Sequence, residues 1–391
     1  PRHIPPTSTP LPLPRPTSPY PIQLHPTPFQ LDVVKFSTDG SLIATAGEGS
    51  VVKVFSSPDG EEIGEAKHTE ESSIVDLAWS VVGVLVSASS SGEIIVSAGG
   101  VGWGVRSSLH VACSPIGIAF RLGTNQLFVA RDDVALTILE LEPGGELTPF
   151  DAGGDYGELV RSELQVLQTL LSIPLQGVRC CAHSPDGMLL ASGCDGGEVL
   201  LHDANGEPVE IGLQTNASEG KPKGLVYQHS DYVRSTAFTT AGTLLATGGD
   251  DGRIALIELS SFTLVASWAL EDYVFNVTFS PGGNVLVSSC RNGLLNVFDV
   301  KSLTEVREVQ PNGEVELTTH AFSPCGSFVA TGDEEGGVTI STISLADTQS
   351  KFTLGDDEEV TALSHATPPG GEPVLACATS EGRVRLLNAS T

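Results

Sequence analysis

The chain alternates short apolar runs with turn-forming residues over almost its whole length. From Asp32 onward, stretches in which apolar and polar side chains alternate are separated by Gly, Asp, Ser and Pro. A period of two predicts β-strands, and the residues between them favour tight turns. Residues 178–203, 233–259 and 274–299 share one order: an alternating strand, a turn, an apolar strand, a tight turn and a second alternating strand. The pattern therefore predicts an all-β protein made of repeated units.

The unit recurs with a regular period. The residue before the third strand returns at intervals of about 41 to 45 residues, as from Gly49 to Gly92 and from Gly252 to Gly293, except where two insertions lengthen the interval. This period is typical of propeller blades rather than of helical or leucine-rich repeats. Eight copies begin at Val33, Val75, Gly117, Val178, Val233, Val274, Leu317 and Val360.

The most distinctive residues of the repeats lie in their turns: SPDG from Ser184, SPGG from Ser280 and ATGGDDG from Ala246. With Phe298 and Asp299 they resemble the WD-repeat β-propeller family, and the resemblance extends from about residue 20 to the end. A four-stranded sheet cannot bury both of its faces alone, so neighbouring units must stack radially into a ring. We expect one closed propeller of four-stranded antiparallel blades. Eight blades are favoured over seven, the alternative if one weaker copy is overcounted.

The resemblance also implies a buried hydrogen-bonded set in the fifth unit. Carried over from the family, this set consists of His229, Thr247 and Asp251, while Ile257 stands where the family has Trp. The sequence contains no Trp-Asp dipeptide. We therefore expect the fold, but identify no subfamily.

A proline-rich arm, residues 1–28, precedes the repeats and holds eleven of the 25 prolines. Such a segment cannot bury enough surface to fold alone. We expect the segment to be a tethering arm rather than a ligand of SH3 or WW domains or the remnant of a transit peptide. The sequence lacks an initial Met, so we expect a processed start. Because the chain ends soon after the last expected strand, we expect residues 20–25 to supply the outer strand of the last blade.

The propeller is expected over residues 29–391, with insertions at 142–176 and 206–228. In the first insertion, residues 158–171 read ELVRSELQVLQTLL, with apolar side chains near helical spacing. An amphipathic helix and an outer strand of the third blade are equally consistent with this pattern. The second insertion contains NASEGKPKG and predicts a surface loop.

The charge is strongly acidic, with 48 Asp and Glu against 20 Lys and Arg and a net charge of −28. This charge disfavours nucleic acid and anionic membrane surfaces as partners. The seven cysteines include no CxxC pair, which favours buried free thiols and an intracellular, reducing compartment. The cytoplasm is the first expectation, with the nucleus or an organelle as alternatives.

No set of residues with catalytic, cofactor-binding or metal-ligating spacing is evident, so we predict a protein that is not an enzyme and has no cofactor. The histidines are dispersed. His183, His320 and His365 fall at what reads as one equivalent strand position, which indicates packing.

Acidic side chains gather in the loops before the first strand and after the second strand of each unit. Many of these carboxylates are expected to be turn formers, but their excess favours a basic partner segment. Two of the loops repeat an aromatic residue, in SDYVR and EDYVF. The candidate protein-binding residues are Asp231, Tyr232, Arg234, Glu271, Asp272, Tyr273, Phe275, Arg291, Asp333, Glu334, Asp356, Asp357, Glu358 and Glu359.

The sequence thus predicts a non-catalytic scaffold that holds partner proteins in a larger assembly and binds a basic segment on its acidic face. Other protein subunits are the expected partners, without nucleic acid or membrane insertion. The alternative is a regulatory or enzymatic subunit with a site at the channel mouth. Recognition of a free basic tail is a third reading, which predicts strong salt dependence.

Overall fold

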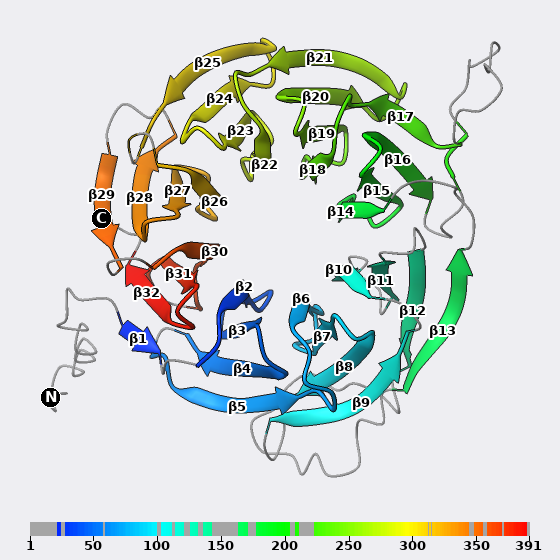
Figure 1. The fold of residues 1–391 in the computed structure, drawn as a ribbon, viewed down its shortest axis with the longest axis vertical. Coiled ribbons are helices and arrows are strands. Elements are labelled where there is room, and N and C mark those ends of the chain that lie inside the picture. Colours follow the sequence, from blue (N-terminus) through cyan, green and yellow to red (C-terminus); the bar gives the residue numbers. More distant parts are fainter. Residues whose placement is uncertain are drawn as a thin grey trace, which may run out of the picture.

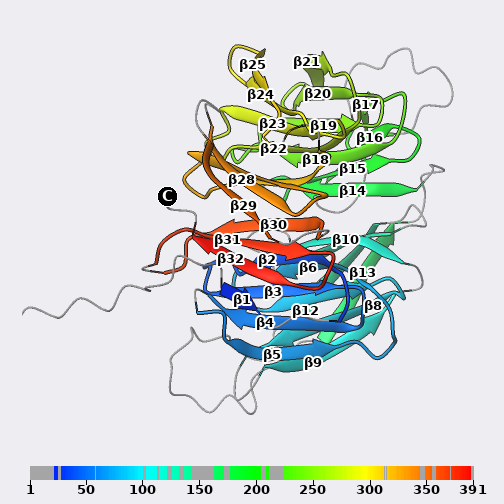
Figure 2. The ribbon, with the colours of Figure 1, turned by 60° about the vertical axis from the view of Figure 1, so that its left-hand side comes forward.

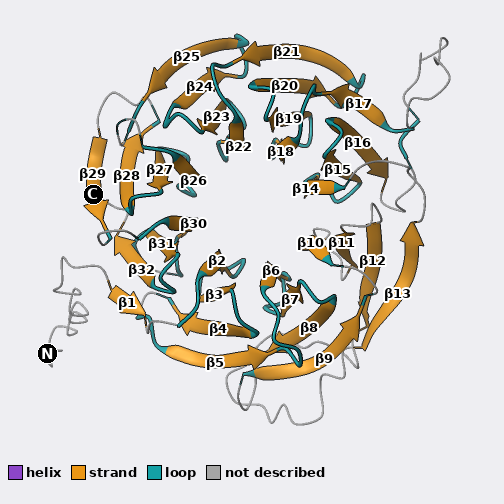
Figure 3. Cartoon of the chain, in the orientation of Figure 1, coloured by secondary structure: helices purple, strands orange, loops and turns teal. Residues whose placement is uncertain are grey.

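The computed structural model describes most of the chain. The described residues are 22–24, 28–57, 59–99, 103–111, 114–120, 126–131, 136–142, 163–170, 177–203, 208–210, 223–311, 313, 315–343, 348–354, 358–369 and 371–388. They form β-strands and loops, and Figure 3 draws no helix among them.

The strands make eight sheets of four antiparallel strands, numbered here in chain order. Sheet 1 contains β2 (Leu31–Phe36), β3 (Leu42–Gly47), β4 (Val51–Ser56) and β5 (Glu62–Lys67). Sheet 2 contains β6 (Ile74–Trp79), β7 (Leu85–Ser89), β8 (Glu93–Ala98) and β9 (Gly104–His110). Sheet 3 contains β10 (Pro115–Phe120), β11 (Gln126–Arg131), β12 (Leu136–Glu142) and β13 (Glu163–Leu170). Sheet 4 contains β14 (Val178–His183), β15 (Leu189–Cys194), β16 (Glu198–Asp203) and β17 (Leu225–Gln228).

The second half of the chain repeats this order. Sheet 5 contains β18 (Val233–Phe238), β19 (Leu244–Gly249), β20 (Arg253–Glu258) and β21 (Thr263–Ala269). Sheet 6 contains β22 (Val274–Phe279), β23 (Val285–Cys290), β24 (Leu295–Asp299) and β25 (Thr304–Val309). Sheet 7 contains β26 (Leu317–Phe322), β27 (Phe328–Asp333), β28 (Gly337–Thr342) and β29 (Thr348–Thr353). Sheet 8 contains β30 (Val360–Ala366), β31 (Val374–Thr379), β32 (Val384–Asn388) and, from the other end of the chain, β1 (Ile22–Leu24).

The sheets are arranged around a central axis (Figure 1). The first strand of each sheet is innermost, and it contacts the first strand of the next sheet all the way from β2 to β30. Strand β30 in turn contacts β2, so sheet 8 lies between sheets 7 and 1, as Figures 1 and 2 both show.

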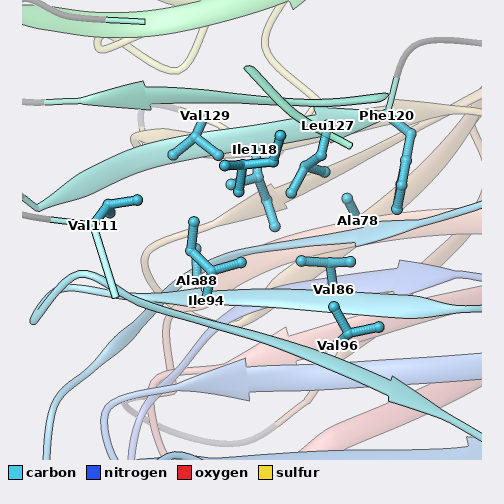
Figure 4. Close-up of a cluster of buried hydrophobic side chains, with 11 residues drawn as sticks. Ala78, Val86, Ala88, Ile94, Val96, Val111, Ile118, Phe120, Leu127 and Val129 are labelled. Atoms are coloured by element: carbon cyan, nitrogen blue, oxygen red, sulfur yellow. The ribbon is translucent and has the colours of Figure 1, made fainter. Parts of the chain in front are cut away.

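The core is formed between neighbouring sheets. In Figure 4, Val86 and Ile94 of sheet 2 pack against Ile118, Leu127 and Val129 of sheet 3. Every residue of β7 and β8 is buried, because each face of this sheet is covered by a neighbour. This double burial explains why the middle strands read as apolar runs, whereas outer strands such as β5 and β25 expose most of their side chains.

Sheet 8 joins the two ends of the described chain. Ile22 pairs with Leu386 and Leu24 with Val384, which places β1 at the outer edge of this sheet. The Leu24 side chain is buried in a cluster with Leu31, Val384 and Leu386. Of the proline-rich arm, residues 1–21 and 25–27 lie outside the described residues.

The first insertion contributes a strand rather than a helix where the structure describes it. Strand β13 pairs with β12 along its length, so of the two readings of residues 158–171 the described part, Glu163–Leu170, takes the strand. The backbone groups along the edge of β12 require hydrogen-bond partners. This requirement outweighs the helical spacing of the apolar residues in the insertion. In the second insertion, Leu225–Gln228 forms β17.

We predict that β1 stabilises the ring. Removing residues 1–24 takes away the three residue pairs between β1 and β32 and the buried Leu24, so the melting temperature should fall by several degrees. Removing only residues 1–20 keeps β1 and should leave the melting temperature unchanged. Equal melting temperatures for the two truncations would show that β1 adds no stability.

We also predict that Leu303→Gly stabilises the protein. Leu303 has a left-handed backbone (φ 57°) and its side chain is 39% exposed, so glycine relieves backbone strain with little loss of packing. The unfolding midpoint in urea should rise, by up to about 1 kcal/mol in free energy. Phe262 has a similar φ of 51° but packs against a buried cluster, so Phe262→Gly should lower the midpoint. A lower midpoint for Leu303→Gly would contradict the strain argument.

Candidate binding face

One end of each sheet carries the loop before its first strand and the turn after its second strand. A backbone hydrogen bond joins these two segments: Asp195 donates to Gly177 (2.7 Å), Asp250 to Tyr232 (2.9 Å) and Arg291 to Tyr273 (3.1 Å). The same bond recurs in sheets 1, 2, 7 and 8, from Glu48 to Gln30, Ser90 to Ser73, Glu334 to Glu316 and Ser380 to Glu359. Because the sheets repeat one order around the axis, these segments lie on one face of the ring, which we call the loop face.

A β-bulge directs further side chains to this face. The register shifts after the first residue of β2, β14, β18 and β22, and the extra residues are Asp32, Arg179, Arg234 and Phe275. A bulge leaves its extra residue out of the ladder and re-aims its side chain. The bulged residues therefore join the loop residues on the same face.

Three arginines and three aromatic rings lie on the loop face of sheets 4–6. The Arg179 guanidinium lies 4.2 Å from the ring centre of Tyr232, in the next sheet, and is ion-paired with Asp195. The Arg291 guanidinium lies 5.4 Å from the ring centre of Tyr273, and its Nε is 3.9 Å from Glu316 Oε2. Cations over aromatic faces are attracted by the ring quadrupole.

Arg234 makes the most ordered of these contacts. Its Nε and Nη2 donate to the two carboxylate oxygens of Asp250 at 2.7 and 2.6 Å, and its guanidinium lies 5.9 Å from the ring centre of Phe275. The hydrogen bonds to Asp250 raise the pKa of Arg234 above its usual value, against the smaller opposing effect of burial. We call Arg179, Arg234, Arg291, Tyr232, Tyr273 and Phe275 the arginine–aromatic group.

Carboxylates dominate the loop face of sheets 7, 8 and 1. Burial raises the pKa of Glu316, and repulsion by Glu334 and Glu359 raises it further, although Arg291 opposes this. The pKa of Glu359 is raised by burial and then by Glu334 and Asp32. Burial raises the pKa of Asp32, a hydrogen bond from Gln30 opposes the shift, and Glu48 adds to it. These five carboxylates, the acidic group, thus repel one another across three adjacent sheets.

The sequence-predicted residues fall into four sets. Tyr232, Arg234, Tyr273, Phe275, Arg291, Glu334 and Glu359 belong to the two groups just described. Asp231 and Asp272 each accept the backbone N–H of the following tyrosine at 2.8 Å, and Glu271 is exposed in the same loop as Asp272. Asp356 and Asp357 lie outside the described residues.

Asp333 and Glu358 are buried and do not contribute to the exposed face. Asp333 accepts the backbone N–H groups of Glu335 (3.0 Å) and Gly337 (2.6 Å), so it shapes the turn after β27. Glu358 is ion-paired with Arg383. The positions of these two acidic residues in the loops predict exposed carboxylates. In the structure, each carboxylate is instead engaged by local hydrogen bonds or by an ion pair.

Sequence reasoning missed Asp32, Arg179 and Glu316 as candidates. Asp32 and Arg179 are second residues of first strands, and Glu316 directly precedes one. Aligning the repeats at the residues that flank Val33, Val178 and Leu317 would have found all three. For Asp32 and Arg179 the decisive feature is the bulge, which the alternation of apolar and polar residues in a strand does not reveal.

The hydrogen-bonded set implied in sheet 5 is present in the structure. His229 Nε2 is 2.9 Å from Thr247 Oγ1, its Nδ1 is 2.9 Å from Asp251 Oδ1, and Ser230 donates its N–H to Asp251 Oδ2 at 3.0 Å. Burial raises the pKa of Asp251, but the hydrogen bonds from His229 and Ser230 outweigh it and the pKa is lowered overall. These hydrogen bonds connect the loop before β18 with the turn before β20.

Sheet 2 builds a related set from another position. His68 Nε2 is 2.8 Å from Ser87 Oγ, and its Nδ1 is 3.3 Å from Glu93 Oε2. Glu93 also accepts the Thr69 N–H at 2.8 Å. Asp251 precedes the turn glycine whereas Glu93 follows it, so the longer side chain reaches back to the same histidine position.

The three histidines read as equivalent occupy two positions. His183 pairs with Leu190 and His365 with Leu375, at the same register, but His320 pairs with Thr331, two residues earlier in its strand. His183 and His365 are the sixth residues of their strands, whereas His320 is the fourth residue of β26. His320 is buried, its Nδ1 lies 3.1 Å from Ser289 Oγ of sheet 6, and burial lowers its pKa to about 4.

Within the described residues, no three side chains of His, Cys, Asp or Glu are arranged so that they could hold a metal ion. The described residues form no helix with the length and apolarity that spanning a bilayer requires.

The family model described as "WD domain, G-beta repeat" matches residues 166–203, 220–258 and 262–299. Among curated proteins, eukaryotic translation initiation factor 3 subunit I from Phaeosphaeria nodorum is 26% identical over 32% of this chain and 42% of the relative. The same subunit from Mycosarcoma maydis is 21% identical over 82% of this chain and 92% of the relative. The chain matches only 19% of the periodic tryptophan protein 2 homolog from Dictyostelium discoideum, at 25% identity over 46% of its own length.

Solved structures match the whole fold. Sqt1 from Chaetomium thermophilum superposes with a TM-score of 0.77 over 95% of this chain and 99% of its own, at 15% identity. Chaetomium thermophilum Sqt1 bound to the N-terminus of ribosomal protein L10 gives a TM-score of 0.74 over 94% and 98%, at 17% identity. At these identities the likeness shows the fold.

We predict that His320 makes stability fall in acid. Its folded pKa, about 4, lies below the ordinary value of 6.5, so the unfolded chain takes up a proton first as the pH falls through 6.5. Stability is then lost progressively until about pH 4, and the loss amounts to about 2 kcal/mol at pH 5.

Chemical denaturation at pH 7 and pH 5 tests this prediction. The variant His320→Gln should lose less stability between the two pH values than the wild type, whatever its stability at pH 7. His110→Gln, which changes an exposed histidine, serves as the matched control and should keep the wild-type pH dependence. The same pH dependence for all three proteins would contradict the assignment.

Proposed function

Because this chain is a member of the WD-repeat β-propeller family, we propose that it is a non-catalytic scaffold that binds a basic segment of a partner protein on its loop face. The observation that carries this proposal is the acidic group: Asp32, Glu48, Glu316, Glu334 and Glu359. Their mutual repulsion is relieved when lysine or arginine side chains bind among them. The whole chain adds a net charge of −28, which steers a basic segment toward it.

The proposal includes one closed ring of eight blades. Its support is the unbroken series of contacts between inner strands, together with the pairing of β1 and β32 in sheet 8. A closed ring holds the loops of all its sheets in fixed relative positions, and binding to a pre-ordered surface costs less entropy than binding to mobile loops. The acidic group needs this rigidity, because it draws on three separate sheets.

The relatives favour a role in assemblies of proteins. Translation initiation factor 3 subunit I is by name a subunit of a larger factor, and a further relative, COMPASS component SWD3 from Saccharomyces cerevisiae, is by name a component. Sqt1, which shares the fold, has been crystallised with the N-terminus of a ribosomal protein. We infer that the partners of this chain are likewise protein subunits, rather than nucleic acid or a membrane.

We further propose an intracellular, reducing location, with the cytoplasm as first choice. The six described cysteines are free thiols, and those at positions 194, 290 and 377 are buried. Burial raises the pKa of Cys194 and Cys290 to about 12, so these thiols are protected from the thiolate chemistry that forms disulfides. This pattern favours a compartment in which thiols stay reduced.

We predict that the acidic group carries the affinity for a basic peptide. The probe is the synthetic peptide AAAKRKRKAAA, and its affinity should fall steeply between about 50 and 300 mM salt. The triple variant Glu316→Gln, Glu334→Gln, Glu359→Gln should weaken binding about tenfold or more at low salt, because each lost ion pair contributes up to about 1 kcal/mol.

The matched control removes the same amount of charge from outside the loop face. Asp59→Asn, Glu61→Gln and Glu65→Gln change exposed residues of the β4–β5 turn and of β5, and this triple variant should bind the probe nearly as the wild type does. An equal loss in both triple variants would reduce the effect to net charge, and an affinity that does not respond to salt would refute the proposal.

A further inference from the structure

Two tyrosines occupy the same position on the loop face of adjacent sheets. Tyr232 precedes β18 and Tyr273 precedes β22, and each follows an aspartate whose carboxylate accepts the tyrosine's own N–H at 2.8 Å. Each also accepts a backbone hydrogen bond at its carbonyl, from Asp250 and Arg291 respectively. The backbone of both tyrosines is therefore fixed from two sides.

An arginine lies over each of the two rings, and the positive charge of each arginine is already balanced by a carboxylate. Arg179 covers Tyr232 from the neighbouring sheet while paired with Asp195, and Arg291 covers Tyr273 while close to Glu316. Each arginine is thus held between a ring and a carboxylate. Ordering a ring in advance removes part of the entropy that binding would otherwise lose.

Despite these contacts both rings remain accessible. The Tyr232 side chain is 38% exposed and that of Tyr273 is 37% exposed, whereas Phe275 is half-buried beneath Arg234. Tyrosine is one of the side chains, with tryptophan and arginine, that are enriched among the residues that contribute most to protein interfaces. Because an arginine already lies over each ring, the ring surface that remains is suited to an aromatic or large apolar side chain.

The tyrosine pair adjoins the acidic group directly. Arg291 touches both Tyr273 and Glu316, so a ring of one group and a carboxylate of the other are separated by a single guanidinium. An extended peptide advances about 3.3 Å per residue, so one segment spans this distance within a few residues.

We propose that the loop face recognises one partner segment in two parts: a run of lysine or arginine on the acidic group and, a few residues away, an aromatic side chain on Tyr232 and Tyr273. The second part rests on the proposed function and adds specificity to it. Basic runs are common, and attraction to carboxylates alone distinguishes them poorly. A nearby aromatic residue selects among basic segments, because only the matching segment covers the rings.

The test is a double-mutant cycle with two synthetic peptides. AWAKRKRKAWA carries tryptophan on both sides of the basic run, which covers either chain direction, and AAAKRKRKAAA lacks it. In about 300 mM salt, where charge attraction is screened, the tryptophan peptide should bind the wild type about tenfold more tightly. The paired variant Tyr232→Ala, Tyr273→Ala should reduce this difference to less than about twofold.

Two further variants separate the parts. The pair Tyr232→Phe, Tyr273→Phe keeps the rings and should keep the tenfold difference, and it also controls for damage to the fold. The triple variant Glu316→Gln, Glu334→Gln, Glu359→Gln should weaken both peptides by similar factors and leave their ratio unchanged.

The outcomes distinguish this inference from the proposed function. If AAAKRKRKAAA binds the wild type in a salt-dependent way but tryptophan adds nothing, or if the tryptophan gain survives in the alanine pair, the two-part recognition is wrong and the proposed function stands. If neither peptide binds even in low salt, the proposed function itself fails.

Discussion

Every four-stranded sheet in this protein depends on its neighbours, because both faces of its middle strands are apolar. Strands β7 and β8 illustrate this dependence: all of their residues are buried, and the clusters that bury them draw on sheets 1, 2 and 3. A sheet released from this arrangement would expose two apolar faces to water, at roughly 25 cal/mol per Å². A sheet is therefore stable when it is packed between its neighbours, and the pairing of β1 with β32 joins the two ends of the described chain in sheet 8.

The same arrangement explains how the loop face acquires a pattern that no single repeat contains. Neighbouring sheets are packed at a fixed spacing, so side chains from different sheets meet in a defined order. Arg179 reaches Tyr232 of the next sheet, and Glu316 of sheet 7 lies beside Arg291 of sheet 6. The acidic group continues this series through Glu359 to Asp32, which are far apart in the sequence but belong to adjacent sheets. The arrangement of side chains on the loop face is therefore a property of the ring rather than of any single repeat.

Much of the fold could be predicted from the sequence because its repeats carry local signals. Alternating strands and the turns at SPDG and ATGGDDG specify a four-stranded antiparallel unit without knowledge of its neighbours. Residues 158–171 were ambiguous, since their apolar spacing suits a helix, and only the open edge of β12 decides for the strand β13.

The binding residues were predicted less well for a related reason. Asp333 and Glu358 are acidic and lie in the expected loops, yet one turns its carboxylate to backbone N–H groups and the other is paired with Arg383. Asp32 and Arg179 were missed because a bulge, not the strand period, brings them to the loop face.

We propose that a basic partner segment binds the loop face of sheets 4–8 and 1. Amide hydrogen exchange, followed by mass spectrometry with and without saturating AWAKRKRKAWA, tests it most directly. Exchange should become slower in the loops that contain Tyr232, Tyr273 and Glu316 and in the turn after β3, with little change in the outer strands β5 and β21. Protection confined to the outer strands or to the opposite face of the ring would contradict it.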